Sequence, residues 1–514
     1  MTDKTMNRID HSIRNVKFAV IGQLLSITLS FISRTIFVRI LGSEYLGLNG
    51  LFTNISSVLS LVELGFGSAI VYSMYKPFAE NDSEKIRSLL ALYRKTYLLL
   101  GTVIAIIGGA FTPFVKHLIK DIPDLPYINQ IYLLFVAMTA LSYLFSYNRS
   151  LFIADQKKYI DSIFYFGFLS LSTVIQIIFL FLTKNYIVYL VIRVVAILLD
   201  NGLITIKVYK KYPFIRSKKP VHKLTLEDKY VLSKNIKALF MHRIGTVVIT
   251  GTSSIIISKF IGLVAVGLYS NYQMITQALV LLLNMVFQSV TPSIGNLGVT
   301  ENKATIHGVF CHLNFICYWL FSFSSISLFV LLNPFITIWL GDSFVFSNEI
   351  VLLIVLLFYQ QGLRNSIMTF RDALGLFWYD RYKPVLEATL NLIISIILVQ
   401  KIGIMGVILG TILSTFLSGF WIESYVLFRH GFDMHPASYY KDYFVKLVLL
   451  FVIGSITYLV CLVPISNAYL AFVYKAFACL VIPNGAIVVL YAKTSEFAFT
   501  KTIVKGFLAK GVER

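Results

Sequence analysis

The segment Arg39-Ile40-Leu41-Gly42, followed by Gly47-Leu48, separates two very apolar stretches, residues 16–41 and 44–75. The pattern returns 220 residues later as Lys259-Phe260-Ile261-Gly262 and Gly267-Leu268, again between apolar segments. Glycine relieves the backbone of a tight turn, and a long cationic side chain can reach lipid headgroups from a helix end. The pattern therefore predicts an exposed turn between antiparallel helices. Its matching position relative to the flanking helices favours an internal duplication over a chance recurrence of common residues.

The composition decides the broad class of protein. Hydrophobic residues make up 57% of the 514 residues and charged residues only 14%, whereas soluble domains carry about 25% charged residues. The mean hydropathy is +0.77. The formal net charge of +20 would suggest a nucleic-acid partner only if the charge gathered on one solvated face. Because the cations instead lie mostly between apolar runs, the sequence predicts an all-α integral membrane protein and no nucleic-acid partner.

Fourteen stretches are long and apolar enough to be transmembrane helices. About 20 residues, at 1.5 Å per residue, cross a hydrocarbon core of about 30 Å. The predicted helices are 16–41, 44–75, 88–115, 128–154, 160–183, 186–207, 233–260, 264–296, 304–332, 348–370, 384–399, 404–428, 443–463 and 468–491.

The distribution of Lys and Arg predicts the orientation of these helices. With a cytoplasmic N-terminus, the connections on the outer side hold only Lys116, Lys120, Lys184, Lys259 and Lys401. The cytoplasmic connections and both tails hold nearly all the other cations, which is the bias typical of cytoplasmic loops. We therefore expect both termini in the cytoplasm. The most basic connection, 207–237, is interpreted as a topology anchor and linker in preference to a docking site for acidic lipid headgroups.

Several kinds of site and processing signal are not predicted. The first apolar run is too long for a cleavable signal peptide, and no small-residue cleavage motif follows it. The four cysteines, at 311, 317, 461 and 479, match neither a zinc site nor a disulfide framework. No P-loop of the form GxxxxGKS/T is present. We therefore expect no metal site, no cofactor and no ATP hydrolysis by this chain.

The duplication predicts how the chain is divided. It relates the first predicted helix to the seventh and the second to the eighth, and an even offset of six spans makes the two copies parallel repeats. The predicted domains are an N-terminal lobe of six helices at 1–208, a basic cytoplasmic linker at 209–232, a C-terminal lobe of six helices at 233–428, and two further helices with a cytoplasmic tail at 429–514. A central cavity between the lobes is expected.

Ionisable residues at membrane depth are the candidates for function, because they are costly there and usually face protein or a water-filled cavity. Most of the deep cations are arginines, whose planar forks bind pyrophosphate or carboxylate bidentately while staying charged. The candidate substrate-binding residues are Arg34, Arg193, Arg243 and Arg364, together with the polar cluster of Gln360, Gln361 and Asn365. The deep acids Glu63 and Asp200 are candidates for ion coupling or charge pairing.

Each candidate has a structural alternative. Arg193 and Asp200 lie seven residues apart on one helix face, so an internal ion pair with another helix is as plausible as a substrate contact. Glu63 could bind a proton or be the fixed partner of an arginine. Single polar residues often only join helices by hydrogen bonds, although the density of the 360–365 cluster favours function. Glu387 and Glu423, near predicted cytoplasmic helix ends, are expected to reach the membrane interface.

Two stretches of the first predicted hairpin, RILGSEYLGL at 39–48 and ELGFGSAI at 63–70, resemble the Wzx-type (polysaccharide transport) oligosaccharide flippases of bacteria. These belong to the multidrug/oligosaccharidyl-lipid/polysaccharide exporter superfamily. The resemblance implies a V-shaped, two-lobed transporter of the bacterial cytoplasmic membrane, without catalytic residues. Such a transporter moves an undecaprenyl-pyrophosphate-linked oligosaccharide to the outer leaflet by alternating access, for a capsule, an O-antigen or another surface glycan.

The resemblance also implies binding residues and partners. In that family, cavity cations meet the pyrophosphate and the sugars, and the positions assigned to this role by depth are Arg34, Arg193, Arg243 and Arg364. Membrane lipid, a polysaccharide polymerase and other export machinery are the implied partners. The sequence does not indicate the sugars, the energy source, the oligomeric state or the glycan pathway.

Three other functions are left open by the sequence. A peptidoglycan lipid-precursor flippase shares the fold and the number of spans. A cation-coupled drug exporter of the same superfamily usually has more interior carboxylates and fewer interior arginines. A membrane polysaccharide polymerase, which would be an enzyme, commonly carries catalytic Asp, His or Arg residues on a sizeable outer loop. The longest outer connections here, 116–127 and 333–347, are short, which argues against the polymerase.

Overall fold

The computed structural model of the chain describes residues 3–63, 65–217, 225, 232–233, 236, 249 and 251–502. Its contacts divide the chain into two compact units, Met1–Gly267 (unit 1) and Leu268–Arg514 (unit 2). Within the described residues all regular secondary structure is helical, which confirms the predicted all-α fold. The predicted lobe and linker boundaries stay a prediction.

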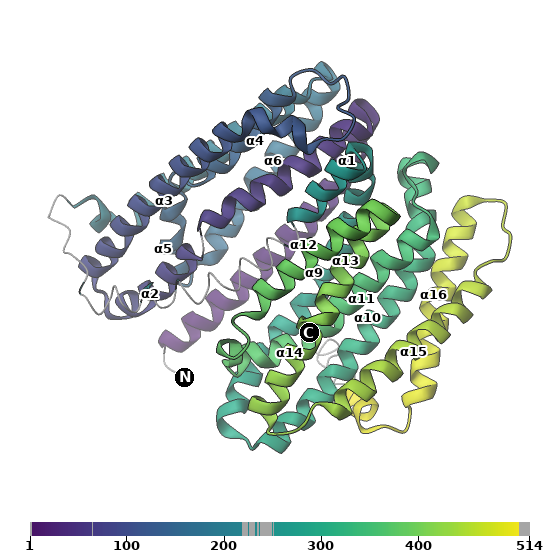
Figure 1. The fold of residues 1–514 in the computed structure, drawn as a ribbon. Helices are drawn as coiled ribbons and strands as arrows, with labels where there is room; N and C mark the ends of the chain where they lie inside the picture. The colour runs from purple at the N-terminus through teal and green to yellow at the C-terminus, as the bar shows by residue number, and fades with distance from the viewer. Residues whose placement is uncertain are drawn as a thin grey trace. The chain divides into compact units, whose positions relative to one another are not determined.

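The helices of unit 1 follow one another closely in the sequence. They are α1 (Asp3–Leu59), α2 (Phe66–Glu80), α3 (Ser83–Phe111), α4 (Ile128–Ser142), α5 (Arg149–Ala154), α6 (Lys158–Thr183) and α7 (Tyr186–Lys211), with short helices η1 (Ser60–Glu63), η2 (Thr112–Leu118), η3 (Ser146–Asn148) and η4 (Pro213–Arg216). Residues 251–260 are also helical. α6 packs against α1 and α7, and α4 packs against α3 and α7 (Figure 1).

The first predicted hairpin is present but its second helix is broken. α1 consists of two helices joined at Gly42, whose backbone (φ 84°, ψ −177°) is not helical. The prediction of one continuous helix over 44–75 is wrong, because η1 and then Gly65 (φ 76°) interrupt it before α2 begins. A positive φ suits glycine, which has no Cβ. The Gly65-Phe66-Gly67 sequence is the local signal for this break.

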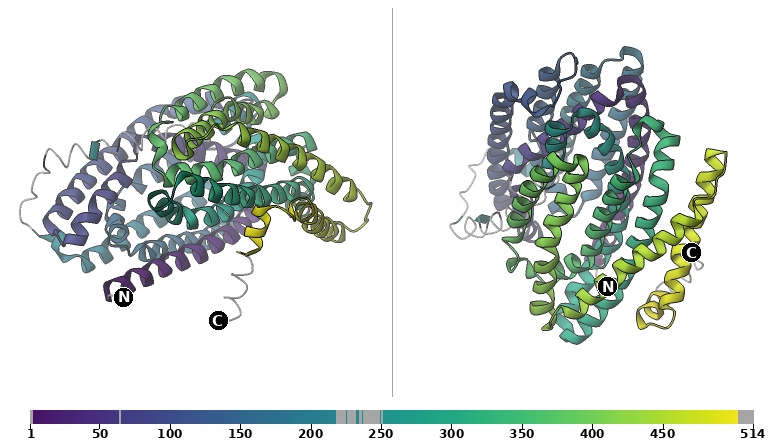
Figure 2. Two further views of the ribbon diagram at one scale, coloured as in Figure 1. Left: turned by 90° about the horizontal axis from the view of Figure 1, so that it is seen from below. Right: turned by 45° about the vertical axis from the view of Figure 1, so that its right-hand side comes forward.

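Unit 2 contains most of α9 and all later elements. These are α9 (Leu263–Thr300), α10 (Lys303–Leu340), η5 (Asp342–Phe344), α11 (Asn348–Ala373), η6 (Leu376–Trp378), α12 (Lys383–Ile402), α13 (Ile404–Leu417), α14 (Gly419–Val426), the π-helical turn η7 (Leu427–Phe432), α15 (Ala437–Val460) and α16 (Ala468–Tyr491). α12 packs against α13, and α10 packs against α11, α15 and α16. The last two helices form the yellow-green and yellow hairpin in Figure 2.

Twelve helices of the described residues are long and apolar enough to cross a membrane, compared with fourteen predicted from the sequence. One difference arises because the first two predicted helices are joined across Gly42 into a single run, Lys17–Leu59. The other concerns the seventh predicted helix, 233–260, which lies mostly outside the described residues. The structure and the prediction therefore agree on the remaining spans, apart from their exact ends.

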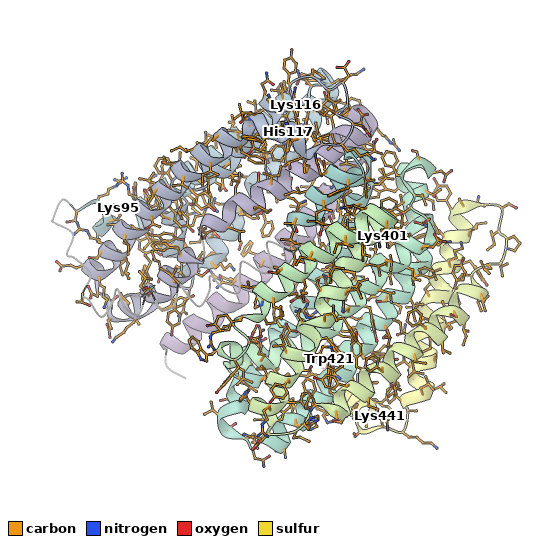
Figure 3. All side chains as sticks on the ribbon, viewed as in Figure 1. Lys95, Lys116, His117, Lys401, Trp421 and Lys441 are labelled. Atoms are coloured by element: carbon orange, nitrogen blue, oxygen red, sulfur yellow. The ribbon has the colours of Figure 1, made fainter. Side chains whose placement is uncertain are left out.

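Large apolar side chains are exposed along the spans of both units. Leu182 of α6 is 74% exposed and Val489 of α16 is 78% exposed. Soluble monomers rarely expose wide apolar surfaces. Because lipid tails are as apolar as leucine, these surfaces suit contact with the lipid of a membrane. Within unit 2, Lys401 and Lys441 lie at opposite ends (Figure 3), as expected for an outer and a cytoplasmic connection. Which end faces the cytoplasm stays a prediction.

The two copies of the turn motif meet inside unit 1. Gly47 of the first copy lies against the backbone carbonyl of Leu263, and Gly267 of the second copy lies against that of Ser43. A Cβ at either glycine would overlap the facing backbone. The second glycine of each copy therefore allows two helices to approach closely, whereas the first glycine forms the turn.

Gly47→Ala is expected to destabilise the protein, because the new methyl group meets rigid backbone and overpacking costs about 1 to 3 kcal/mol. Gly167→Ala is the matched control, since Gly167 is also helical but a Cβ there meets nothing within 4 Å. In open space the same change favours the helix by up to about 1 kcal/mol. Thermal unfolding of the purified proteins in detergent measures both, and equal effects of the two changes would contradict the tight contact.

Candidate functional site

Unit 2 holds a buried cluster of two cations and two carboxylates. Arg364 of α11 donates to both oxygens of Glu423 at 3.0 and 2.7 Å and to Glu387 at 3.2 Å. Lys383 Nζ lies 2.8 Å from Glu387 Oε2 and 2.6 Å from Glu423 Oε1. Glu423 is completely buried, and Glu387 is 3% exposed. The two positive and two negative charges cancel, so the cluster is neutral as a whole.

Local sequence explains how the cluster is assembled. Lys383 and Glu387 are four residues apart on α12 and therefore share a face. Glu423 comes from α14, after the interruption of the helix at Ser418. Gly419 faces the cluster, and a Cβ there would come within 3.2 Å of the Arg364 guanidinium. A larger residue at this position would crowd the ion pairs.

The sequence predicted a role for three members of this cluster, Glu387, Glu423 and Arg364. The expectation that Glu387 and Glu423 reach the membrane interface is wrong, because both are buried partners of Arg364 and Lys383. The reason is tertiary: the carboxylates come from α12 and α14, and sequence depth alone does not show that they converge on α11. A substrate contact by Arg364 stays a prediction, and the structure places its guanidinium between carboxylates.

The polar residues beside Arg364 point to different neighbours. Gln360 Nε2 donates to the carbonyl of Ile412 in α13 at 3.1 Å. Asn365 Nδ2 donates to Asn284 Oδ1 in α9 at 2.7 Å. Gln361 is half-buried. The dense polar stretch therefore joins α11 to two other helices of unit 2. A contact of these residues with substrate stays a prediction.

In unit 1, Asp200 is paired with an arginine that the sequence analysis did not single out. Arg149 of α5 forms ion pairs with Asp200 and, at 2.6 Å, with Asp161, and it donates to Asn201 at 3.1 Å. Asp200 is therefore paired with another helix, as the structural alternative proposed. The sequence did contain a signal for this residue, because Arg149 is a cation inside the apolar run 128–154. The predicted single helix over that run is interrupted between α4 and α5.

Arg193 has a neutral partner. Its Nη1 donates to Ser172 Oγ of α6 at 3.3 Å, and the side chain is half-buried. Among the residues that the structure describes, no carboxylate lies within ion-pair distance of Arg193, in contrast to Arg149 and Arg364. The charge of Arg193 also acts at longer range on Asp200, which is itself paired with Arg149.

Arg34 lies on α1 beside the phenol groups of Tyr186 and Tyr189. These tyrosines and Arg193 are spaced three and four residues apart on α7, so they share one helix face. Tyr186 OH donates to Asn49 Oδ1 at 3.1 Å, and Tyr189 OH lies 3.4 Å from Ser33 Oγ. The facing surfaces of α1 and α7 thus combine guanidinium groups with aromatic hydroxyls.

Glu63 is held by phenols at the break between α1 and α2. Tyr97 OH donates to Glu63 Oε1 at 2.6 Å, and Tyr143 OH lies 3.5 Å from Oε2. Tyr93 OH donates to Tyr97 OH at 3.1 Å. A Cβ at Gly67 would collide with the hydroxyls of Tyr93 and Tyr97, so this glycine leaves room for the network.

The last predicted site residue, Arg243, lies outside the described residues. Over the part of the chain that is described, no three His, Cys, Asp or Glu side chains are grouped as metal ligands would be. The interior chemistry of the described residues therefore consists of ion pairs, arginines with hydroxyl neighbours, and one carboxylate held by tyrosines.

Comparison with known proteins places the chain in a family. Residues 12–297, more than half of the chain, match the model of the family described as polysaccharide biosynthesis protein. The chain belongs to this family. A search of curated proteins finds no match.

Solved structures share the fold. A structure of the lipid II flippase MurJ in an inward closed conformation matches with a TM-score of 0.65 and 17% identity, over 92% of this chain and 98% of that one. The Vibrio cholerae MATE transporter VcmN, in a variant form, matches with a TM-score of 0.57 and 13% identity, over 84% and 99%. An inward-facing multidrug resistance MATE family transporter of the MOP superfamily matches at 0.52 and 14%, over 79% and 98%. The fold implied by the resemblance is therefore shared with these three structures.

Glu423→Gln is expected to destabilise the protein strongly, because it removes one carboxylate from a buried neutral cluster. Breaking a buried ion pair in this way costs about 3 to 5 kcal/mol. Adding Lys383→Met restores the charge balance, so the double variant should lose less stability than the sum of the single losses. Thermal unfolding of the four proteins of this cycle measures the coupling, and strictly additive losses would contradict a shared network.

Proposed function

We propose that this protein is a flippase for undecaprenyl-pyrophosphate-linked oligosaccharides, which moves repeat units of a surface polysaccharide from the cytoplasmic to the outer leaflet. We place it in the bacterial cytoplasmic membrane, with both termini in the cytoplasm. Membership of the polysaccharide biosynthesis family and the fold shared with a lipid II flippase support this function. A lipid-linked sugar with two phosphate charges cannot cross hydrocarbon unaided, and a cationic polar path lowers that barrier.

The observation that carries the proposal is the difference between two kinds of interior arginine. Arg149 and Arg364 are compensated by carboxylates of the same unit. Arg193 instead contacts a serine hydroxyl, with no carboxylate partner among the described residues. Its charge reaches Asp200 only at longer range. A cation without a direct ion pair at membrane depth is costly, and a pyrophosphate that accepts two hydrogen bonds from the guanidinium would offset that cost.

The roles of the other candidates follow from their surroundings. We assign Arg34 to the same anion path, with Tyr186 and Tyr189 as hydroxyl and ring contacts for sugars. We also assign Arg243 to substrate binding, because of its predicted depth in the membrane. Arg364, Gln360, Gln361 and Asn365 are assigned to the substrate path of unit 2, with Arg364 held in place by its carboxylates. Asp200 is assigned to charge pairing with Arg149.

Two other functions are the main competitors. The shared fold with a lipid II flippase is compatible with a peptidoglycan lipid precursor as the alternative substrate. The shared fold with MATE transporters is compatible with a cation-coupled drug exporter as the alternative function. The family description favours the surface polysaccharide. A polymerase is the alternative of another class, and a partner polymerase with other export machinery is expected in the proposed pathway.

The leaflet position of lipid-linked oligosaccharide in cells depleted of the protein tests the function. A membrane-impermeant sugar label is applied to intact cells and to inverted vesicles. Complete repeat units trapped in the cytoplasmic leaflet support the proposal. Units that reach the outer leaflet without polymerising would assign a polymerase, trapped peptidoglycan precursor would assign the alternative flippase, and no change in either leaflet would favour the drug exporter.

Arg193→Gln is expected to reduce surface glycan while the protein stays in the membrane. Loss of a hydrogen bond to a charged group, about 1.5 to 3 kcal/mol, lowers transport by roughly ten to a hundredfold. Arg34→Ala should act in the same direction, and Arg193→Lys should restore only part of the activity because Lys cannot bind bidentately. Lys95→Gln on α3, an exposed cation (Figure 3), is the control. Normal glycan in Arg193→Gln would remove this residue from the path.

Glu63→Gln is expected to uncouple transport from a proton gradient. The Gln side-chain oxygen still accepts the hydrogen bond from Tyr97, but the group no longer ionises. Uptake of lipid-linked oligosaccharide into inverted vesicles, with and without an imposed pH gradient, measures the coupling. If the gradient stimulates the variant and the natural protein equally, Glu63 is a structural partner of the tyrosines.

A further inference from the structure

A cavity of about 350 Å³ lies within unit 2, and its lining includes none of the four residues of the buried charge cluster. It is bounded by the first turns of α10, by η7, by the start of α15 and by the segment that follows α16. Its ionisable and polar lining includes His307, Cys311, Asn314, Asp442, Lys446 and Glu496. This volume is within the range typical of small-molecule sites, about 300 to 1,000 Å³.

The charges in this cavity leave an excess of negative charge. Lys446 is buried, and its Nζ lies 2.6 Å from Asp442 Oδ2 and 5.2 Å from the centre of the Tyr318 ring. Asp442 is thereby neutralised, although its side chain stays 44% exposed. Glu496 accepts a bond from the Ser495 hydroxyl at 3.2 Å. Two carboxylates therefore share the cavity with one ammonium group.

The walls of the cavity are aromatic. Phe310, Phe428, Tyr439 and Tyr491 line it, and the first three pack against one another with ring centres 5.5 to 6.3 Å apart. Aromatic faces attract cations, and groups of such rings form the cages that bind ammonium ligands. Carboxylates beside aromatic rings in a half-enclosed space favour a cationic ligand group over an anionic one.

We propose that this cavity binds the primary ammonium group of an aminophospholipid headgroup. Glu496 and Asp442 accept its hydrogen bonds, and the aromatic rings enclose its carbon atoms. Lys446, at the inner wall, is placed to meet the phosphate of the same headgroup. A lipid is the source of the amine because the cavity lies at the ends of the membrane-spanning helices α10, α15 and α16. This inference does not rest on the proposed function.

The single half-buried cysteine of the cavity provides the test. Cys311 lines the site, whereas Cys317, Cys461 and Cys479 are at most 3% exposed. The full-length protein is reconstituted in bilayers of phosphatidylcholine alone or with phosphatidylethanolamine, and the rate of maleimide labelling is measured, with Cys311→Ser as background. Phosphatidylethanolamine should slow labelling by roughly tenfold, because a site occupied for about nine tenths of the time is open for the rest.

Variants decide whether the carboxylate recognises the amine. Glu496→Gln should lose the protection, whereas Glu349→Gln, an exposed carboxylate at the first turn of α11, should keep it. Both proteins must show unchanged thermal unfolding. Equal labelling in the two lipids, or protection that survives Glu496→Gln, would overturn the proposal. Equal protection by free ethanolamine would overturn the assignment to a lipid.

Discussion

A charge at membrane depth persists only if something compensates it, and this constraint accounts for the interior of both units. Removing an ion from water is expensive, and a carboxylate or guanidinium group repays part of that cost only through good geometry and several hydrogen bonds. Arg364 meets the condition with two carboxylates and Lys383 nearby. Arg149 meets it with Asp161 and Asp200. Each cluster joins three helices, so it fixes packing as well as charge.

The same constraint distinguishes the arginines with direct ion pairs from Arg193. A compensated arginine has its hydrogen-bond donors engaged, and a ligand would have to displace a buried carboxylate to reach them. Arg193 donates to a serine hydroxyl and acts on Asp200 only at longer range, so among the described residues no direct ion pair of Arg193 would have to break before an anion reached it. Glu63 is a carboxylate that accepts a hydrogen bond from Tyr97 and lies close to the hydroxyl of Tyr143. Predicted depth in the membrane identified these residues as candidates. The groups that contact each residue then show whether it is held in a direct ion pair.

Sequence predicted those features that depend on local pattern. The apolar runs gave the spans, and Gly42 marked a real turn because the residues that define it are adjacent. The break at Gly65 was missed because the hydrophobic run continues through it. The pairing of Glu387 and Glu423 with Arg364 could not be predicted, because the three residues come from different helices. Arg149 was overlooked for a similar reason: its partners follow it by 12 and 51 residues.

The two copies of the turn motif share one packing requirement. In both copies of the motif the second glycine is required by the same contact, in which each helix faces a backbone carbonyl of the other copy. Packing of this kind constrains both copies together, so the pattern is retained.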